Sequence, residues 1–101
     1  MADTNYVGGM VKILEKPTQK IFNDKISVTE LRAQLPQTRN STIVNLIFWG
    51  NLGHDIINYY QVNDYIMIEG YLSSRSKSKI NSIQNSKKVY ITVLKIYFIK
   101  S

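Results

Sequence analysis

The chain has 101 residues, enough for one compact domain with one modest core but not for two. Thirteen Lys and Arg against seven Asp and Glu give a net charge of +6, which favours an anionic partner such as nucleic acid or a lipid surface. The lack of cysteine excludes disulfides and thiolate zinc sites, and a single histidine, His54, argues against a histidine-based metal site or catalytic triad.

Hydrophobic residues alternate with polar ones along the first half of the chain, which is typical of half-buried strands. The alternation predicts strands over residues 9–17, 25–35 and 41–49. In the second of these, the hydrophobic phase shifts by one position partway along. We interpret that shift as a β-bulge near Thr29 and Glu30.

A short helix is predicted over residues 51–61, where the alternation stops. Gly50 permits a tight turn from strand to helix, and Asn51 is expected to cap the first turn. The residues spaced for one apolar helical face are Leu52, Ile56, Tyr59 and Tyr60. Two further strands follow at residues 64–72 and 88–99, with Gly70 where a coiled strand must bend.

This order of elements predicts an all-β protein, a five-stranded oligonucleotide-binding (OB) fold barrel with one short helix between strands 3 and 4. Closure into a barrel also removes the exposed edges of so short a sheet. A β-sandwich and an unrelated small α+β domain are alternatives that the pattern leaves open. We expect residues 1–101 to form a single domain, with a flexible N-terminus at 1–5 and a basic loop at 73–88 between strands 4 and 5.

The sequence offers little for catalysis. Its seven acidic residues are scattered, and no spacing forces two carboxylates together. His54 and Asp55 are most simply a solvated helix face, and the glycine pair Gly8–Gly9 precedes a strand rather than a phosphate-binding helix. We therefore expect no enzyme activity, no metal and no cofactor.

Two basic clusters could bind a phosphate backbone, because each neutralised phosphate releases counterions. The loop at 73–88 and its flanks carry Arg75, Lys77, Lys79, Lys87 and Lys88 without an acid among them. The second cluster surrounds the first hairpin, and its expected contacts are Lys20 and Lys25. The alternative is that both are solvated loops kept polar.

Aromatic side chains on the outside of a strand would complete a site for single-stranded nucleic acid, because bases stack on them. The alternation places Phe48 in the core, so the neighbouring Trp49 must point outward. Tyr71 is a second outward candidate. Most aromatic residues in small domains belong to the core or to an interface, which is the alternative for each.

The segment 47–75 resembles the hallmark stretch of bacterial-type single-stranded DNA-binding proteins (SSB). In that family an apolar strand ends in an aromatic residue and glycine, followed by a helix with a tyrosine and a strand ending EG-x-L-x-x-R. The matching positions here are Trp49–Gly50, Tyr60, Glu69–Gly70–Tyr71–Leu72 and Arg75. The most similar type is the short, tail-less SSB-like protein of plastids and cyanobacteria.

Two tryptophans of the family are replaced, by Ile43 and by Lys77, and we expect no acidic tail of the kind that recruits replication proteins. Primosomal replication protein B, a dimeric relative, shows a similar reduction. The resemblance therefore implies a self-associating barrel. Because one small barrel cannot bury hydrophobic residues on both faces, we expect a homodimer or homotetramer with Ile43, Ile47 and Tyr97 in its interface.

The sequence thus predicts a non-catalytic single-stranded DNA-binding protein that uses base stacking and Lys or Arg contacts to phosphates. An oligomeric interaction module of the primosomal replication protein B kind, with weak or no DNA binding, is the first alternative, and RNA binding is the second. No segment is apolar over the length that a membrane span requires. The resemblance to the plastid type implies a protein made in the chloroplast stroma, with the bacterial cytoplasm as the alternative. The bias toward Ile, Asn, Lys, Tyr and Ser is typical of an AT-rich genome, which includes plastids and some bacteria.

Overall fold

The structure is a computed structural model that describes residues 5–22, 25–36, 42–76, 87–97 and 99. The strands are β1 (Tyr6–Ile13), β2 (Thr18–Phe22), β3 (Ile26–Leu35), β4 (Thr42–Trp49), β5 (Tyr65–Ser76) and β6 (Lys87–Tyr97). The helix α1 (Asn51–Tyr59) lies between β4 and β5. No helix in these residues is long and apolar enough to cross a membrane.

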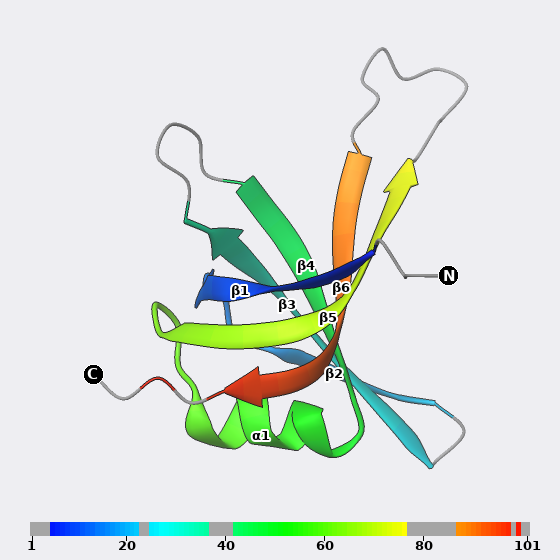
Figure 1. Cartoon of the computed structure of the whole chain (residues 1–101). Helices are drawn as coiled ribbons and strands as arrows, with labels where there is room; N and C mark the ends of the chain where they lie inside the picture. Colours follow the sequence, from blue (N-terminus) through cyan, green and yellow to red (C-terminus); the bar gives the residue numbers. More distant parts are fainter. Residues whose placement is uncertain (1–4, 23–24, 37–41, 77–86, 98, 100–101) are drawn as a thin grey trace.

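Five of the strands close into a ring (Figure 1). The sheet order is β1-β5-β6-β4-β3-β2, and a second pairing joins β1 to β3 through Lys12 with Gln34 and Ile13 with Ala33. All pairings are antiparallel except the one between β4 and β6. This is the predicted OB architecture. The sequence reading missed β2, which lies outside the ring as the second arm of a hairpin with β3.

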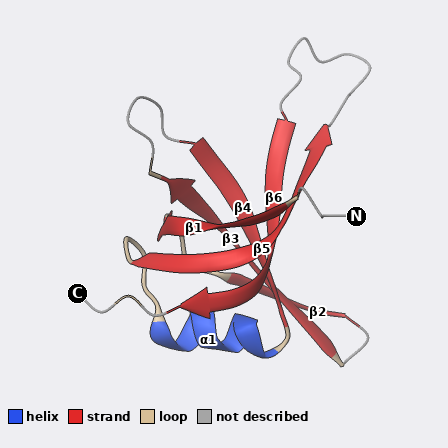
Figure 2. Cartoon of the chain, in the orientation of Figure 1, coloured by secondary structure: helices blue, strands red, loops and turns tan. Residues whose placement is uncertain are grey.

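The helix covers one end of the ring (Figure 2). Its Ile56 is fully buried and belongs to the core, which Phe48 and Leu46 fill from β4. Gly53 allows the helix to lie directly on β3, because a Cβ at this position would come within 2.3 Å of the Thr29 hydroxyl oxygen. The remaining core residues are Val11, Ile13, Leu31, Ala33, Val44, Ile66, Ile68, Ile91 and Val93.

Three details of the predicted helix were wrong. It ends at Tyr59 rather than Gln61, and Tyr59 is 65% exposed instead of lying on the buried face. The helix is capped by Gly50 rather than by Asn51. Gly50 has φ of 60°, a backbone conformation that favours glycine, and no side chain donates or accepts a capping hydrogen bond there.

The predicted β-bulge near Thr29 and Glu30 was also wrong. The pairing of β3 with β2 and with β4 runs through these residues without a register shift. The one bulge among the described strands lies between β5 and β6, where the register shifts between Glu69 and Gly70. Gly70 is required there because a Cβ would come within 2.1 Å of the Thr92 carbonyl oxygen.

The segment expected as a basic loop is shorter than predicted, since β5 continues to Ser76 and β6 begins at Lys87. Residues 77–86 lie outside the described residues, as do 1–4 of the expected flexible N-terminus. Asn5 is described, and its carbonyl accepts a 2.8 Å hydrogen bond from the Leu72 amide.

Candidate nucleic-acid interface

The outer surface of β2, β3 and β4, here called the binding face, carries Trp49. Phe48 is fully buried and Trp49 is 50% exposed, as the strand alternation predicts. Trp49 pairs across the sheet with Val28, which in turn pairs with Lys20 on β2. Because directly paired residues in antiparallel strands share one face, Lys20, Val28 and Trp49 form a row across three strands.

The hairpin formed by β2 and β3 carries two lysines, one in this row and one in the turn. Lys20 and Lys25, both expected to contact phosphate, are exposed. A further cation on the binding face, Arg32, is engaged by Glu15. The Arg32 Nε lies 2.9 Å from one Glu15 carboxylate oxygen, and the Arg32 amide donates to the other at 3.1 Å. Trp49 therefore shares the binding face with the cations Lys20 and Arg32 and with one acid, Glu30, and the charge of Arg32 is paired with Glu15.

The paired ends of β5 and β6, which flank the other basic cluster, lie at the opposite end of the ring from the end of β4 (Figure 1). Ile47 is the register partner of Thr92, so Trp49 lies level with residue 94, seven residues from the start of β6 at Lys87. At about 3.3 Å per residue, this separation is about 23 Å. The structure therefore pairs Trp49 with Lys20 and not with the β5–β6 hairpin.

The expected contacts in that hairpin are described only in part. Lys88 is exposed on β6. Arg75 and Lys87 belong to the paired ends of β5 and β6, but their side chains are outside the described part of the chain. Lys77 and Lys79 lie wholly outside it.

Tyr71 lies on a different surface, the outer side of β1, β5 and β6, here called the tyrosine face. Its ring makes an edge-on contact with Tyr6, with centroids 5.4 Å apart at 75°. The Tyr6 hydroxyl donates a 2.6 Å hydrogen bond to Glu69. This bond is the main reason that the pKa of Tyr6 rises to about 12 and that the pKa of Glu69 falls below its usual value.

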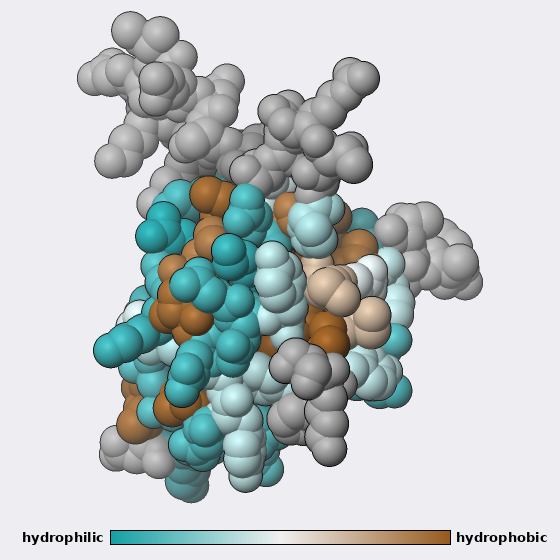
Figure 3. Space-filling view, turned by 90° about the vertical axis from the view of Figure 1, so that its left-hand side faces the viewer, coloured by the Kyte–Doolittle hydropathy of each residue, from teal (hydrophilic) through white to brown (hydrophobic). Residues whose placement is uncertain are grey.

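Apolar and aromatic side chains gather on the tyrosine face. Met10 pairs with Met67, which pairs with Tyr97, and the three are between 38% and 41% exposed. Figure 3 shows one side of the molecule, on which hydrophobic residues form several patches between hydrophilic ones. Of the expected interface residues, Tyr97 lies on this face, whereas Ile43 and Ile47 lie on the outer side of β4 with Trp49.

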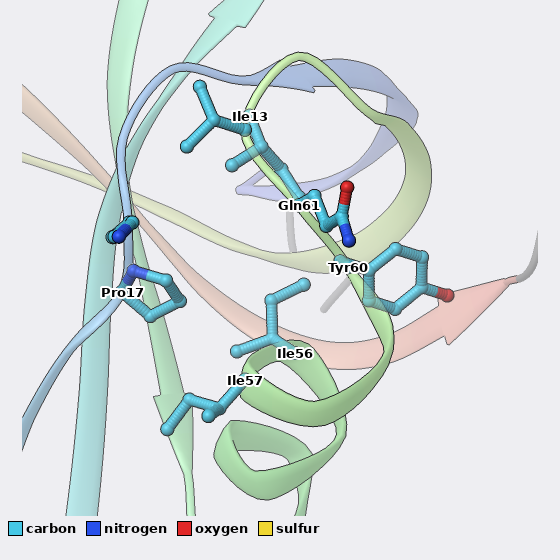
Figure 4. A pocket seen from close by; sticks show the side chains of 8 residues that line it. Ile13, Pro17, Ile56, Ile57, Tyr60 and Gln61 are labelled. Atoms are coloured by element: carbon cyan, nitrogen blue, oxygen red, sulfur yellow. The ribbon is translucent and has the colours of Figure 1, made fainter.

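A cavity of about 580 Å³ lies between α1 and the segment that joins β1 to β2 (Figure 4). Its walls are mostly apolar, with Ile56, Ile57 and Pro17 facing one another and the Tyr60 hydroxyl pointing away from them. Burial, and then the charges of Asp55 and Asp64, raise the pKa of Tyr60. Among the described residues there is no group of three His, Cys, Asp or Glu that could hold a metal ion.

The sequence did not predict that Val28 is buried on the outer face of the ring. Val28 is 4% exposed although it lies on the outer face, outside the core cluster. Two consecutive buried residues, Val28 and Thr29, caused the apparent phase shift that was interpreted as a bulge. The signal was therefore present in the sequence, but it reflected side chains that cover Val28 from outside the ring.

No family model matches the chain. A protein of Trieres chinensis named "Putative single-stranded DNA-binding protein ycf41" is 41% identical over 98 residues, which cover 92% of this chain and 87% of that protein. The SSB domain of a Synechococcus protein superposes with a TM-score of 0.76 at 18% identity, covering 97% of this chain and 99% of that domain.

The second single-stranded DNA-binding protein of Mycobacterium smegmatis superposes with a TM-score of 0.73 at 19% identity, covering 92% of this chain and 86% of that one. At such identity the two structures show a shared fold, and the Trieres protein shows the family. The chain therefore belongs to the family of bacterial-type single-stranded DNA-binding proteins, as a member of its short ycf41 type.

Proposed function

We propose that the protein binds single-stranded DNA on the binding face and catalyses no reaction. The observation that carries this proposal is Trp49, half exposed on a strand and aligned with Lys20 across the sheet. In OB folds the face of the second and third ring strands, here β3 and β4, is the usual surface for oligonucleotides. The name of the Trieres chinensis relative supports the same ligand.

The interaction combines two contributions. A base stacked on Trp49 contributes about 1–3 kcal/mol without regard to sequence. Lys20 and Lys25 are placed to neutralise phosphates, which makes affinity fall as salt rises, with a slope of about −0.7 per phosphate for single strands. Together these contributions predict sequence-tolerant, salt-sensitive binding.

Fluorescence anisotropy with a labelled oligo(dT) at two salt concentrations tests the proposal. Trp49→Ala should weaken binding about 5- to 150-fold, the equivalent of one lost stack, and Trp49→Phe should lose less. Tyr59→Ala is the matched control, because Tyr59 is an exposed aromatic residue on α1, outside the binding face. Absence of a complex at low salt, or equal affinities for Trp49→Ala and Tyr59→Ala, would refute the proposal. Duplex DNA and RNA in the same assay measure strand preference.

We further propose that the basic end of the β5–β6 hairpin makes a second contact with longer strands. The expected residues there are Arg75, Lys77, Lys79, Lys87 and Lys88. Because this end lies about 23 Å from the level of Trp49, an oligonucleotide too short to reach both should not sense it. Lys88→Ala should therefore weaken binding of a long oligo(dT) and leave a very short one unchanged.

We assign self-association to the tyrosine face, as a homodimer or homotetramer. Met10, Met67, Tyr71 and Tyr97 form an apolar surface there that a second copy would cover. In sedimentation experiments Met67→Glu should reduce the oligomer mass, whereas Ile21→Glu, at an exposed residue of β2, should not. An unchanged mass for Met67→Glu would refute this assignment. The ycf-type name of the relative supports a plastid location.

A further inference from the structure

Val28 is covered although it lies on the outside of the ring. Only 4% of its surface is exposed, whereas Ile26, two residues earlier on the same face of β3, is 48% exposed. Val28 does not belong to the core cluster inside the ring. Its cover must therefore come from neighbours on the binding face, and its two direct cross-strand partners are Trp49 and Lys20.

The hydrogen bonding brings Trp49 close to Val28. The Gly50 amide donates to the Ser27 carbonyl at 2.9 Å, so Ser27 and Gly50 form a hydrogen-bonded pair. Hydrogen-bonded and non-hydrogen-bonded pairs alternate along antiparallel strands, which makes Val28 and Trp49 the narrow, non-hydrogen-bonded kind. The Cα atoms of such a pair lie about 4.5 Å apart, which brings the two side chains closer together than in a hydrogen-bonded pair.

Lys20 lies on the other side of Val28 at a slightly larger spacing. A residue in a narrow pair with one neighbouring strand directs its amide and carbonyl to the other, so Val28 and Lys20 form a hydrogen-bonded pair with a Cα separation of about 5.5 Å. Lys20 and Trp49 are thus about 10 Å apart along a line across β2, β3 and β4. That distance suits the length of a lysine side chain reaching toward a group beside the indole.

We propose that Trp49, Val28 and Lys20 form a subsite for one nucleotide, an inference that rests on the proposed function. Val28 supports the inner face of the indole, so that only its outer face accepts a base. The Lys20 ammonium binds the phosphate next to that base. At this subsite the bound strand crosses from β4 over β3 to β2, toward the β2–β3 hairpin.

A double-mutant cycle tests the coupling between the base and phosphate contacts, with a short labelled oligo(dT) at low salt. Lys20→Ala should weaken binding several-fold in the wild-type background and less than about twofold in Trp49→Ala, because the base no longer places the phosphate. Lys95→Ala removes an exposed lysine outside the binding face and is the matched control, which should leave the affinity of both backgrounds unchanged. An equal loss for Lys20→Ala in the wild-type and Trp49→Ala backgrounds would overturn the inference.

Tryptophan emission of the free protein tests the support by Val28 independently of DNA. Val28→Ala should shift the emission of Trp49, the single tryptophan, to longer wavelength and lower its anisotropy. Ile26→Ala, on the same face of β3, should leave both unchanged. If Val28→Ala does not fold, Val28→Thr replaces it, because threonine keeps the shape of the valine side chain. Val28→Thr should preserve the emission of Trp49 and the affinity for oligo(dT).

The two readouts separate the inference from the proposed function. If Trp49→Ala weakens binding but Val28→Ala leaves the emission unchanged, the subsite is wrong and the binding face stands. If the wild-type protein forms no complex with oligo(dT), the proposed function fails, and the nucleotide subsite fails with it. A changed emission together with non-additive loss for Lys20→Ala supports both.

Discussion

Gly70 offers the sharpest test of how the ring is built. A methyl group added there would stand 2.1 Å from the Thr92 carbonyl oxygen and 2.9 Å from its carbon. To restore even a tight 3.0 Å contact, the oxygen must retreat by about 0.9 Å, and it belongs to backbone that cannot rotate away. The substitution Gly70→Ala must therefore move β6 away from β5 at the bulge.

The expected loss combines overpacking, about 1–3 kcal/mol, with weakened ladder hydrogen bonds of about 1 kcal/mol each. We expect a total of about 3 kcal/mol, which for a domain of this size lowers Tm by about 12–24 °C at 4–8 °C per kcal/mol. Thermal and urea unfolding followed by circular dichroism measure it. The control is Gly9→Ala on β1, where an added Cβ meets nothing within 4 Å. Equal stability of the two variants would refute the reasoning.

Two other predictions concern charged groups. The folded-state pKa of Tyr6, about 12, exceeds its ordinary value of 10.0, so its contribution to stability is present below pH 10 and lost as pH rises toward 12. In an absorbance titration, Tyr6→Phe should remove one tyrosine that ionises at high pH. The pKa of Glu69, followed by NMR of its carboxyl group, should rise because the hydrogen bond from Tyr6 is lost. An unchanged pKa of Glu69 would contradict that hydrogen bond. Glu15→Gln should release Arg32 on the binding face, strengthen binding to oligo(dT) and steepen its salt dependence, while unfolding free energy changes by less than about 1 kcal/mol. An unaltered salt slope would show that Arg32 contacts no phosphate.

The ring strands could be predicted from the sequence because each has one face in a closed core. Ile66 and Ile68 alternate with the exposed Tyr65 and Met67, and this burial follows directly from the two-residue period of a strand. The bend at Gly70 was also predicted and coincides with the observed bulge. The local hydrophobic pattern therefore suffices to predict a strand when only one face of that strand is buried.

Other features depend on contacts between distant segments, and the sequence reading missed them. The strand β2 lies outside the ring, and none of its residues whose side chains the structure describes belongs to the core cluster, so no hydrophobic alternation marks it. Val28 is buried on the outer face by residues of two other strands, which imitates a phase shift. Tyr59 has helical spacing with Ile56 but points to solvent, because α1 is short and buries only a narrow stripe.

The sequence predicted Trp49, the central residue of the candidate site, but not the positions of the basic residues relative to it. The outward direction of Trp49 follows from its position after a core phenylalanine. Its distance from the basic cluster of the β5–β6 hairpin does not, because that depends on strands of twelve and eleven residues that extend far beyond the level of Trp49. Lys20 was expected to contact phosphate, but its alignment with Trp49 follows only from the register of β2, β3 and β4.

The outer surface of the closed ring carries different side chains on the binding face and on the tyrosine face. On the binding face, Lys20 lies in one row with the tryptophan, and Glu30 and Arg32 follow along β3. On the tyrosine face, Glu69 accepts the hydrogen bond of Tyr6 beside Tyr71, and a phosphate placed there would meet a carboxylate whose lowered pKa keeps it charged. Lys95 pairs with Glu69 on that face and balances its charge, so we expect Trp49 and Lys20, rather than a net charge difference, to direct a single strand of DNA to β2, β3 and β4. Covering the tyrosine face with a second copy would then leave the binding face of each subunit open.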